Sequence, residues 1–548
     1  MSHFSAFFVS PRRCPTRAGF LAPCWTTGWA AAWRSAGLIA LLIPLAGCQT
    51  YTSQTAQRDA DLRRGSLDSA VLRANADALR NDDTKDAVLF RLEQGAILRH
   101  AALARLPLPS QVRTERGASE IGPARPEAAD AAPTERPEEA NLRASLAAFD
   151  RAEERMNAYD REPEVRLGSS SLALLTNLAN LPYEGRAYDR ILMHGYKALN
   201  YLQLGERDAA RVELNRALQR QRDALAENSA RLAEAEVAAS ELRSGRLTDR
   251  EGNRAVYDIS RTLGDADARR RLGAVDASVQ ARIRPYGDYV NPFVVFLDGL
   301  FFLTQAEDRS DLERARLSFE RVASFAPDNP YAVADAAMAE AAAEGKMPEG
   351  LTYVIYEAGV APFREEIRLQ LPLYLVTDKV SYVGAAFPYL RFSQGRPPVL
   401  NVTAEGVTLP SALVCSMDSV IASDFRNEWP SVVTKTLVGT AFRATLDAAM
   451  QRKAKKELGE RGQAFFEILT AVIQDSTNIA DTRTWRSLPQ EFHTVRLATP
   501  ADRKLVLSVG GATQTVELSP GRINLVYVKL IDPGSPLLVN QGVLVPVP

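Results

Sequence analysis

The residues most able to do chemistry in this chain are few and scattered. Beyond Cys48 the sequence holds three histidines, His100, His194 and His493, and one further cysteine, Cys415. None lies in an HExxH, a paired CxxC, a G-x-S-x-G or a P-loop pattern, the spacings that metal, nucleophile and phosphate chemistry use. A histidine with no second ligand at helical spacing is typical of a packed or surface side chain. The sequence therefore predicts no catalytic residue, no metal and no cofactor.

Cys415 and His493 could in principle form a nucleophilic dyad, because an imidazole base beside a thiol activates it for attack. Nothing in the sequence brings the two residues together. A lone thiol is more typical of a small buried core residue than of a reactive group. We therefore expect Cys415 to be structural.

Asp481, Arg483 and Trp485 lie just ahead of the last β-rich runs. An acid, an arginine and an indole so close together could form a charge-assisted, aromatic-lined binding corner. The alternative is a structural turn in which Asp481 or Thr482 caps backbone amides, Arg483 pairs with a carboxylate and Trp485 covers the sheet edge. The residue types leave both interpretations open.

Cys48 follows Leu45-Ala46-Gly47, at the end of a ten-residue apolar run from Ala36 to Leu45 with several arginines upstream. A charged region, an apolar region and small residues before a cut mark a secretory signal, and a cysteine after the cut resembles a bacterial lipobox. The run is too short to span a bilayer. We expect residues 1–47 to be a signal peptide and Cys48 to be a lipidated N-terminus that anchors the chain without spanning the membrane. Gln49, where inner-membrane lipoproteins usually carry Asp, points to the periplasmic face of the outer membrane.

The chain has 548 residues and a formal net charge of -1. This length is enough for two or more domains, and the balanced charge gives no support for a nucleic-acid partner. Residues 48–105 place apolar side chains at three- and four-residue steps, as helices do. Residues 106–140 hold six prolines among Ala, Glu and Arg, which predicts a disordered insert. The oligomeric state does not follow from these quantities.

Without that insert, the flanking helices resemble one split tetratricopeptide repeat. Gly95 and Leu98 precede the insert, and Ser145, Phe149 and Ala152 follow it. In this repeat family a small residue on the first helix lets the second helix approach, and a large residue fills the gap one turn on. We therefore expect Gly95 and Leu98 to pack against Phe149 and Ala152.

Two further copies show the same pattern. The best copy, from about 186 to 221, places its packing positions at Ala198, Tyr201, Gly205, Ala210, Leu214 and Ala217. Another, from 291 to 330, uses Gly299, Phe302, Ala315, Phe319 and Val322. The copies predict a tetratricopeptide-like helical solenoid over 141–347. Residues 220–287 form an excursion from it that we expect to be a solvated helical hairpin.

After Gly350 the pattern becomes alternating and β-rich. Residues 351–356 and 367–371 are expected to pair as strands, and further strands are expected at 399–402, 494–497, 504–509, 513–518 and 523–530. Helices are expected at 417–428, at 430–457 with Pro430 in the first turn, and at 463–473. Residues 348–548 thus predict a smaller C-terminal α+β domain with antiparallel strands, and the fold class of the whole chain is α+β.

Several short segments carry a wider resemblance. They are Gly185-Arg186-Ala187-Tyr188, Ala198-Leu199-Asn200-Tyr201-Leu202, Asn291-Pro292-Phe293, Tyr356-Glu357-Ala358-Gly359 and the Asp481 to Trp485 motif. Together they resemble a family of uncharacterised Gram-negative outer-membrane lipoproteins with tetratricopeptide-like repeats. The resemblance implies the anchor, the helical repeats and a C-terminal domain, and it implies no catalytic residue.

These expectations favour a membrane-anchored periplasmic lipoprotein that is not an enzyme. Solenoids generally present a concave surface to another protein, so the expected partner is a protein of the cell envelope. Envelope assembly or cell-wall synthesis is the expected setting, by a loose resemblance to repeat-containing lipoproteins that activate cell-wall synthases. The alternative is an envelope hydrolase or transferase with its site in the C-terminal domain, which would need polar groups converging in a pocket.

Overall fold

The N-terminal helices pack around one helix that is buried along its whole length. The computed structural model describes residues 51–109, 136–161, 179, 181–247, 256–373, 381–445 and 479–547. The predicted signal peptide, Cys48 and most of the predicted insert lie outside these residues. The first helices are α2 (Tyr51–Arg63), α3 (Leu67–Arg80), α4 (Ala87–Leu103) and α6 (Pro137–Arg161). Every residue of α4 is buried, and α6 already begins within the last residues of the predicted insert.

The expected packing of Gly95 against Phe149 is confirmed. A Cβ atom at Gly95 would lie only 2.5 Å from the Phe149 ring, so only glycine permits this approach of α4 to α6. The Ser145 hydroxyl donates a hydrogen bond to the Gly95 carbonyl oxygen at 2.7 Å. Leu98 and Ala152 are also buried. The two helices on either side of the insert therefore form a tightly packed pair.

The second pair consists of α9 (Ala187–Leu204) and α10 (Arg207–Arg243). Its turn depends on Gly205, whose φ of +77° is a left-handed conformation that glycine adopts without strain. Four of the six predicted packing residues are fully buried, namely Ala198, Ala210, Leu214 and Ala217. Tyr201 packs half-buried at the edge of the core. The predicted frame of this helix pair is therefore correct.

The third group is α13 (Pro292–Thr304), α14 (Arg309–Phe325) and α15 (Pro330–Ala343). Asn291 and Asn329 each cap a helix by accepting two backbone N–H bonds, and a proline follows each cap. A Cβ atom at Gly299 would lie 3.1 Å from the Phe319 ring. The glycine-on-phenylalanine contact of α4 and α6 thus recurs in α13 and α14. Successive groups also touch, because α6 packs on α9, and α9 and α10 pack on α13.

The excursion between the second and third groups is not the solvated hairpin that we expected. It continues α10 to a length of 37 residues and returns through α11 (Ser260–Gly264) and α12 (Ala266–Gln280). Both short helices pack on strand β2 (Phe363–Leu373), and the Thr262 hydroxyl donates to the Pro372 carbonyl oxygen at 2.8 Å. The polar sequence of the excursion gave no sign of this contact, because half-buried helices need few apolar residues.

The strands form two sheets and a hairpin. They are β1 (Leu351–Ala358), β2, β3 (Ser381–Arg391), β4 (Asn401–Ala404), β5 (Val407–Pro410), β6 (Ala412–Ser416), β7 (Glu491–Ala498), β8 (Lys504–Val509), β9 (Ala512–Glu517), β10 (Ile523–Leu530) and β11 (Leu538–Val545). The five-stranded sheet has the order β11-β10-β1-β7-β6, the four-stranded sheet has the order β5-β4-β8-β9, and β2 pairs with β3. Among the strand pairs that the structure describes, only β1 and β10 are parallel; the other pairs are antiparallel.

The expected pairing of 351–356 with 367–371 is wrong. β1 lies between β10 and β7 at the centre of the larger sheet, and β2 forms its own hairpin with β3. Nearly every residue of β1 is buried, whereas β2 exposes part of its length. A strand buried on both faces belongs in the middle of a sheet. The expected pairing assumed instead that two strands adjacent in the sequence pair with each other. Strands β3, β5, β6 and β11 were not predicted.

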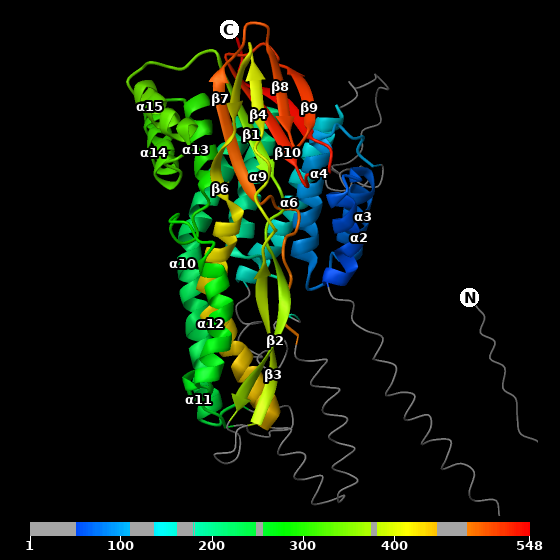
Figure 1. Cartoon of the computed structure of the whole chain (residues 1–548), viewed down its shortest axis with the longest axis vertical. Helices are drawn as coiled ribbons and strands as arrows, with labels where there is room; N and C mark the ends of the chain where they lie inside the picture. The colour runs from blue at the N-terminus through cyan, green and yellow to red at the C-terminus, as the bar shows by residue number, and fades with distance from the viewer. Residues whose placement is uncertain are drawn as a thin grey trace, which may run out of the picture. The chain divides into compact units, whose positions relative to one another are not determined.

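The larger sheet is covered on both faces. Val354 and Tyr356 of β1 join a core shared with β4, β8 and β9 of the four-stranded sheet. Tyr353 and Ile355 point to the other face and join the helical core, where the Tyr353 ring lies 6.3 Å from the ring of Phe296 on α13. Figure 1 shows the two sheets together at one end of the view and the β2–β3 hairpin at the other. The described residues from Tyr51 onward form one compact unit.

One long helix replaces two predicted ones. Residues 417–445 are helical without interruption, and Pro430 lies inside the helix rather than at its start. A proline there removes one backbone hydrogen bond, but burial of Phe425, Trp429 and Val433 holds the helix to the core. The predicted helix at 463–473 lies outside the described residues. None of the helices described has a stretch long and apolar enough to span a bilayer.

Candidate functional site

A cleft of about 390 Å³ opens beside the first turn of the 417–445 helix. Four chain segments line it: residues 281–284 after α12, residues 395–396 after β3, the helix start at Ser416 and Asp418, and residues 490–491 at the start of β7. Because these segments are far apart in the sequence, only the tertiary fold creates the cleft. It was not predicted.

Local hydrogen bonds hold the segment with Arg282 and Arg284 against the helix start. The Ser416 hydroxyl accepts the backbone N–H of Ser419 at 3.4 Å, as an N-cap does. The backbone N–H of Arg284 donates to the Ser419 hydroxyl at 2.8 Å, and that of Ser416 donates to the Tyr286 hydroxyl at 3.2 Å. The arginines are therefore placed at the positive end of the helix dipole.

The rim of the cleft carries three arginines, Arg282, Arg284 and Arg396, which we call the cleft arginines. All three are exposed. No ion pair joins any of them to a carboxylate in the part of the chain that the structure describes. The Arg282 guanidinium lies over the Phe392 ring, 5.0 Å from its centroid, and this contact leaves its N–H groups available. The rim therefore presents three guanidinium groups that have no ion pair among the described residues.

The floor of the cleft is polar and buried. The Gln490 side-chain amide donates to Asp418 Oδ2 at 3.2 Å and to the Gly395 carbonyl oxygen at 3.3 Å. Asp418 is only 6% exposed, and its other oxygen, Oδ1, has no hydrogen-bond partner among the described residues. Burial raises the pKa of Asp418 to about 6, against the opposing effects of the Gln490 hydrogen bond and the Arg282 charge. Asp418 thus places a buried acceptor oxygen, unpaired among the described residues, at the floor of the cleft.

The charged and polar groups of this cleft are suited to binding a ligand. Arginine forks and a helix N-terminus favour carboxylate or phosphate oxygens. The unused Asp418 oxygen favours a hydrogen-bond donor on the same ligand. Glu491, the second acid of the floor, is held by His493 Nε2 at 2.8 Å. The cleft is therefore suited to an anion that also carries an N–H or O–H group.

Asp481, Arg483 and Trp485, the predicted binding corner, lie inside the fold and connect distant parts of the chain. Arg483 Nε donates to Asp481 Oδ1 at 2.8 Å, and its Nη1 donates to Asp86 Oδ1 at 2.8 Å and to the Leu181 carbonyl oxygen at 2.7 Å. Burial raises the pKa of Asp481, but the Arg483 charge and hydrogen bond outweigh this effect, so the pKa lies below its usual value. Every charge at this corner is matched within the protein.

Trp485 is fully buried. Its ring packs edge-on against Phe149 and Tyr196, with 6.0 Å between centroids in both cases, and its N–H donates to the Ser487 hydroxyl at 2.8 Å. The indole thus fills the junction between the helix pairs and the C-terminal segment. This geometry fits the structural alternative for Asp481, Arg483 and Trp485, because no open surface is left for a ligand at the indole.

Cys415 and His493 lie on adjacent strands but on opposite faces of the sheet. Cys415 is paired with Phe492 in the register of β6 and β7, and both belong to the helical core. His493 follows Phe492 and therefore points to the other face, where its ring lies 5.8 Å from that of Tyr356. Burial raises the pKa of the Cys415 thiol to about 12. The pair has neither the geometry nor the thiolate that a dyad needs.

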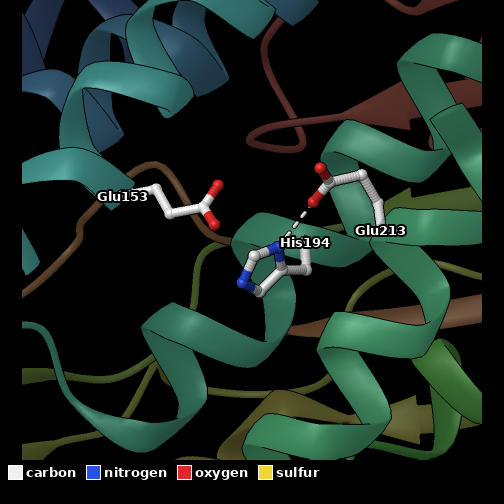
Figure 2. A group of neighbouring side chains, drawn as sticks. All are labelled: Glu153, His194 and Glu213. Carbon is white, nitrogen blue, oxygen red and sulfur yellow. Dashed lines mark hydrogen bonds and ion pairs between the residues drawn. The ribbon is translucent and has the colours of Figure 1, made fainter. Parts of the chain in front are cut away.

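His194 gains two acidic neighbours that the sequence did not reveal. Figure 2 shows His194 of α9 with Glu153 of α6 and Glu213 of α10, and its Nδ1 lies 2.6 Å from Glu213 Oε2. The three possible ligand atoms are within 4.8 Å of one another. However, the Lys197 ammonium lies 2.6 Å from Glu153 Oε2 and 3.0 Å from Glu213 Oε1. This lysine supplies the positive charge that a metal would bring.

The lysine remains charged in this cluster. Although burial lowers the pKa of Lys197, the carboxylates of Glu213, Asp150 and Glu153 raise it above its ordinary value. The cluster is therefore an ion-pair network that ties α6, α9 and α10 together. We assign no metal to it.

Sequence reasoning missed the cleft because its residues have no motif. Arg282 and Arg284 lie near the end of the predicted 220–287 excursion, and Asp418 lies two residues after a serine that could cap a helix. Those signals indicate helix ends, but they do not show that Arg396 and Gln490 lie beside them. Comparison with protein-family models, with curated proteins and with solved structures finds no match to this chain. A function must therefore be argued from the geometry.

Proposed function

We propose that this protein is a lipid-anchored scaffold of the cell envelope, on the periplasmic face of the outer membrane, that holds a protein partner without catalysing a reaction. The observation that carries the proposal is the cleft. Its arginines have no ion pair among the described residues and its floor holds an unpaired acceptor, which suits charge-assisted binding of a ligand, while the only suggested nucleophile and base lie on opposite faces of a sheet. We therefore do not propose the alternative hydrolase or transferase.

The helix pairs support the scaffold interpretation. Their glycine-on-phenylalanine contacts recur in α4 with α6 and in α13 with α14, as expected for copies of one tetratricopeptide-like unit. We propose that these units descend from one repeat and serve as a rigid frame. In this interpretation the frame holds the five-stranded sheet and, through it, the segments that line the cleft.

The anchor is tested by replacing the proposed lipid acceptor. Cys48→Ala should abolish labelling with a radioactive fatty acid and leave an unprocessed or soluble product, because the thiol is the only acceptor in the proposed motif. Normal processing together with unchanged detergent extraction would contradict the anchor.

The partner is tested by site-specific crosslinking in intact cells. A photo-crosslinking amino acid in place of Ala281, an exposed residue that lines the cleft, should give a discrete protein adduct on irradiation. The matched control is the same replacement at Val407, which is 61% exposed on the four-stranded sheet. Identical adducts at both positions, or none at Ala281, would contradict a protein partner at the cleft.

A further inference from the structure

We infer that the cleft binds a short acidic peptide segment, whose carboxylates contact the cleft arginines and whose backbone N–H donates to Asp418. This inference rests on the proposed function, since it names the part of the partner that enters the cleft. It assigns a ligand class to a site that was not predicted from the sequence. Three features of the cleft lead to it.

The first feature is the distribution of positive charge. Arg282 and Arg284 come from one segment, and Arg396 comes from another, so the rim carries charge on two separate pieces of chain. Each guanidinium can take a carboxylate in a two-point fork. Several carboxylates spaced along a chain satisfy such a rim better than one compact phosphate does.

The second feature is the unused acceptor on the floor. Asp418 is more than nine-tenths buried, lines the cleft, and has one oxygen without a hydrogen-bond partner among the described residues. A buried acceptor left unpaired is costly, so a ligand that donates to it gains affinity. A peptide backbone brings N–H donors together with its side-chain carboxylates, whereas a simple polyanion brings acceptors only.

The third feature is the helix start beneath the rim. Ser416 caps the 417–445 helix, and the cleft lies at this N-terminal end. The partial positive charge of a helix N-terminus adds to the attraction for a carboxylate. The volume of about 390 Å³ is within the range of small-ligand sites, so a few residues of a peptide enter rather than a folded domain.

The experiment uses the full lipidated protein purified in detergent and a fluorescent hexapeptide, acetylated and amidated, with alternating glutamate and glycine. Fluorescence anisotropy should show binding that weakens with salt. The triple variant R282Q, R284Q, R396Q should lose at least about tenfold in affinity, because charge-assisted hydrogen bonds are removed. Equal binding by this variant would overturn the inference.

A matched control separates local contact from general charge. Arg269, Arg270 and Arg271 are exposed on α12 and do not line the cleft. The variant R269Q, R270Q, R271Q changes net charge by the same amount, so its affinity for the peptide should stay within about twofold of the unchanged protein. A loss as large as that of the cleft variant would show nonspecific attraction and overturn the inference.

A change in the ligand tests the donor without any mutation. Replacing every residue of the peptide by its N-methyl form removes the main-chain N–H groups of all six residues but keeps every carboxylate, and should weaken binding roughly tenfold. Equal binding of the methylated peptide would overturn the role of Asp418. Tighter binding of tricarballylate, inorganic phosphate or glucose 1-phosphate than of the peptide would assign the cleft to small anions or to a phosphorylated glycan and would also overturn the inference.

The outcomes separate this inference from the proposed function. A protein adduct at Ala281 without peptide binding would leave the scaffold proposal in place and reject the acidic segment. Peptide binding with no adduct in cells would support the chemistry of the cleft and reject the protein partner. Absence of both would reject both.

Discussion

Two groups of arginine in this protein behave in opposite ways. Arg483 is buried between Asp481 and Asp86 and donates to a backbone carbonyl as well, so the protein uses all of its charge. The cleft arginines are exposed and have no ion pair among the described residues. An arginine beside acids and aromatics in the sequence can therefore be structural. Arginines in a stretch without any motif can instead line an exposed cleft.

The largest expected effect on stability concerns the buried arginine, Arg483. Arg483→Ala should lower the free energy of unfolding by about 3 to 5 kcal/mol, because it removes the buried cation that Asp481 and Asp86 share. Among the described residues, these carboxylates then keep only the longer ion pair to Arg186 and the one to the partly exposed Lys85. Denaturant unfolding followed by circular dichroism measures the change. A loss below about 1 kcal/mol would mean that the corner is not structural and would reopen the binding interpretation.

The next effect concerns Phe149, which lies in the core beside Trp485. Phe149 contacts Gly95 on α4 and lies edge-on to Trp485. Phe149→Ala should cost about 3 to 5 kcal/mol, because it opens a cavity where α4, α6 and the C-terminal segment meet. The same unfolding measurement applies, with Leu72→Ala on exposed α3 surface as the control expected to change little. Equal effects of the two variants would show that the helix pair is not the core unit.

A smaller effect comes from the floor of the cleft and depends on pH. The folded-state pKa of Asp418 is raised to about 6. Between about pH 4 and pH 6, the folded protein therefore holds a proton on Asp418 that the unfolded chain has released. This contribution to stability is present below about pH 4 and is lost as the pH rises through about 6. Asp418→Asn should therefore stabilise the protein by about 1 to 3 kcal/mol at pH 7.5.

The pH dependence of that difference supplies the control. Thermal unfolding of the unchanged protein and of Asp418→Asn should converge as the pH falls to about 4, where both side chains are neutral. A stabilisation that is the same at pH 4.5 and pH 7.5 would show that the variant acts through packing rather than through the charge of Asp418.

The smallest expected effect on stability is at the rim. Arg396→Gln should change the free energy of unfolding by less than about 0.5 kcal/mol, because an exposed side chain without an ion pair contributes little to the fold. This small change in the free energy of unfolding contrasts with the several kcal/mol expected for Arg483→Ala. A loss of more than about 2 kcal/mol would mean that Arg396 has a structural role and that the two groups of arginine do not differ.

Periodicity in the sequence was enough to find the helix pairs. Gly95 with Phe149, and Ala198 with Leu214, were placed correctly because close helix packing needs small and large residues at fixed steps. Strands β8 and β10 were likewise predicted at their observed bounds, because alternating or β-branched runs between turn residues are local signals. These features depend on neighbours within a few turns or a single strand.

Other contacts between residues distant in the sequence were not predicted. The alternation in β1 indicates a strand but does not choose β10 and β7 over β2, since the choice depends on which surfaces are left to bury. The 417–445 helix continues through Pro430 because burial outweighs one lost hydrogen bond. In both places tertiary packing overrode a correct local signal.

By itself, then, the sequence determined an α+β chain with helix pairs, their packing positions and several strands, because those patterns are set by backbone periodicity. Only the tertiary structure decided that Arg483 is paired with carboxylates and that the cleft arginines have no ion pair among the described residues. An arginine has the same local signature in both settings; its role is set by whether carboxylates from distant segments arrive beside it. Asp86 reaches Arg483 across the fold, whereas the segments that surround Arg282, Arg284 and Arg396 leave a cleft.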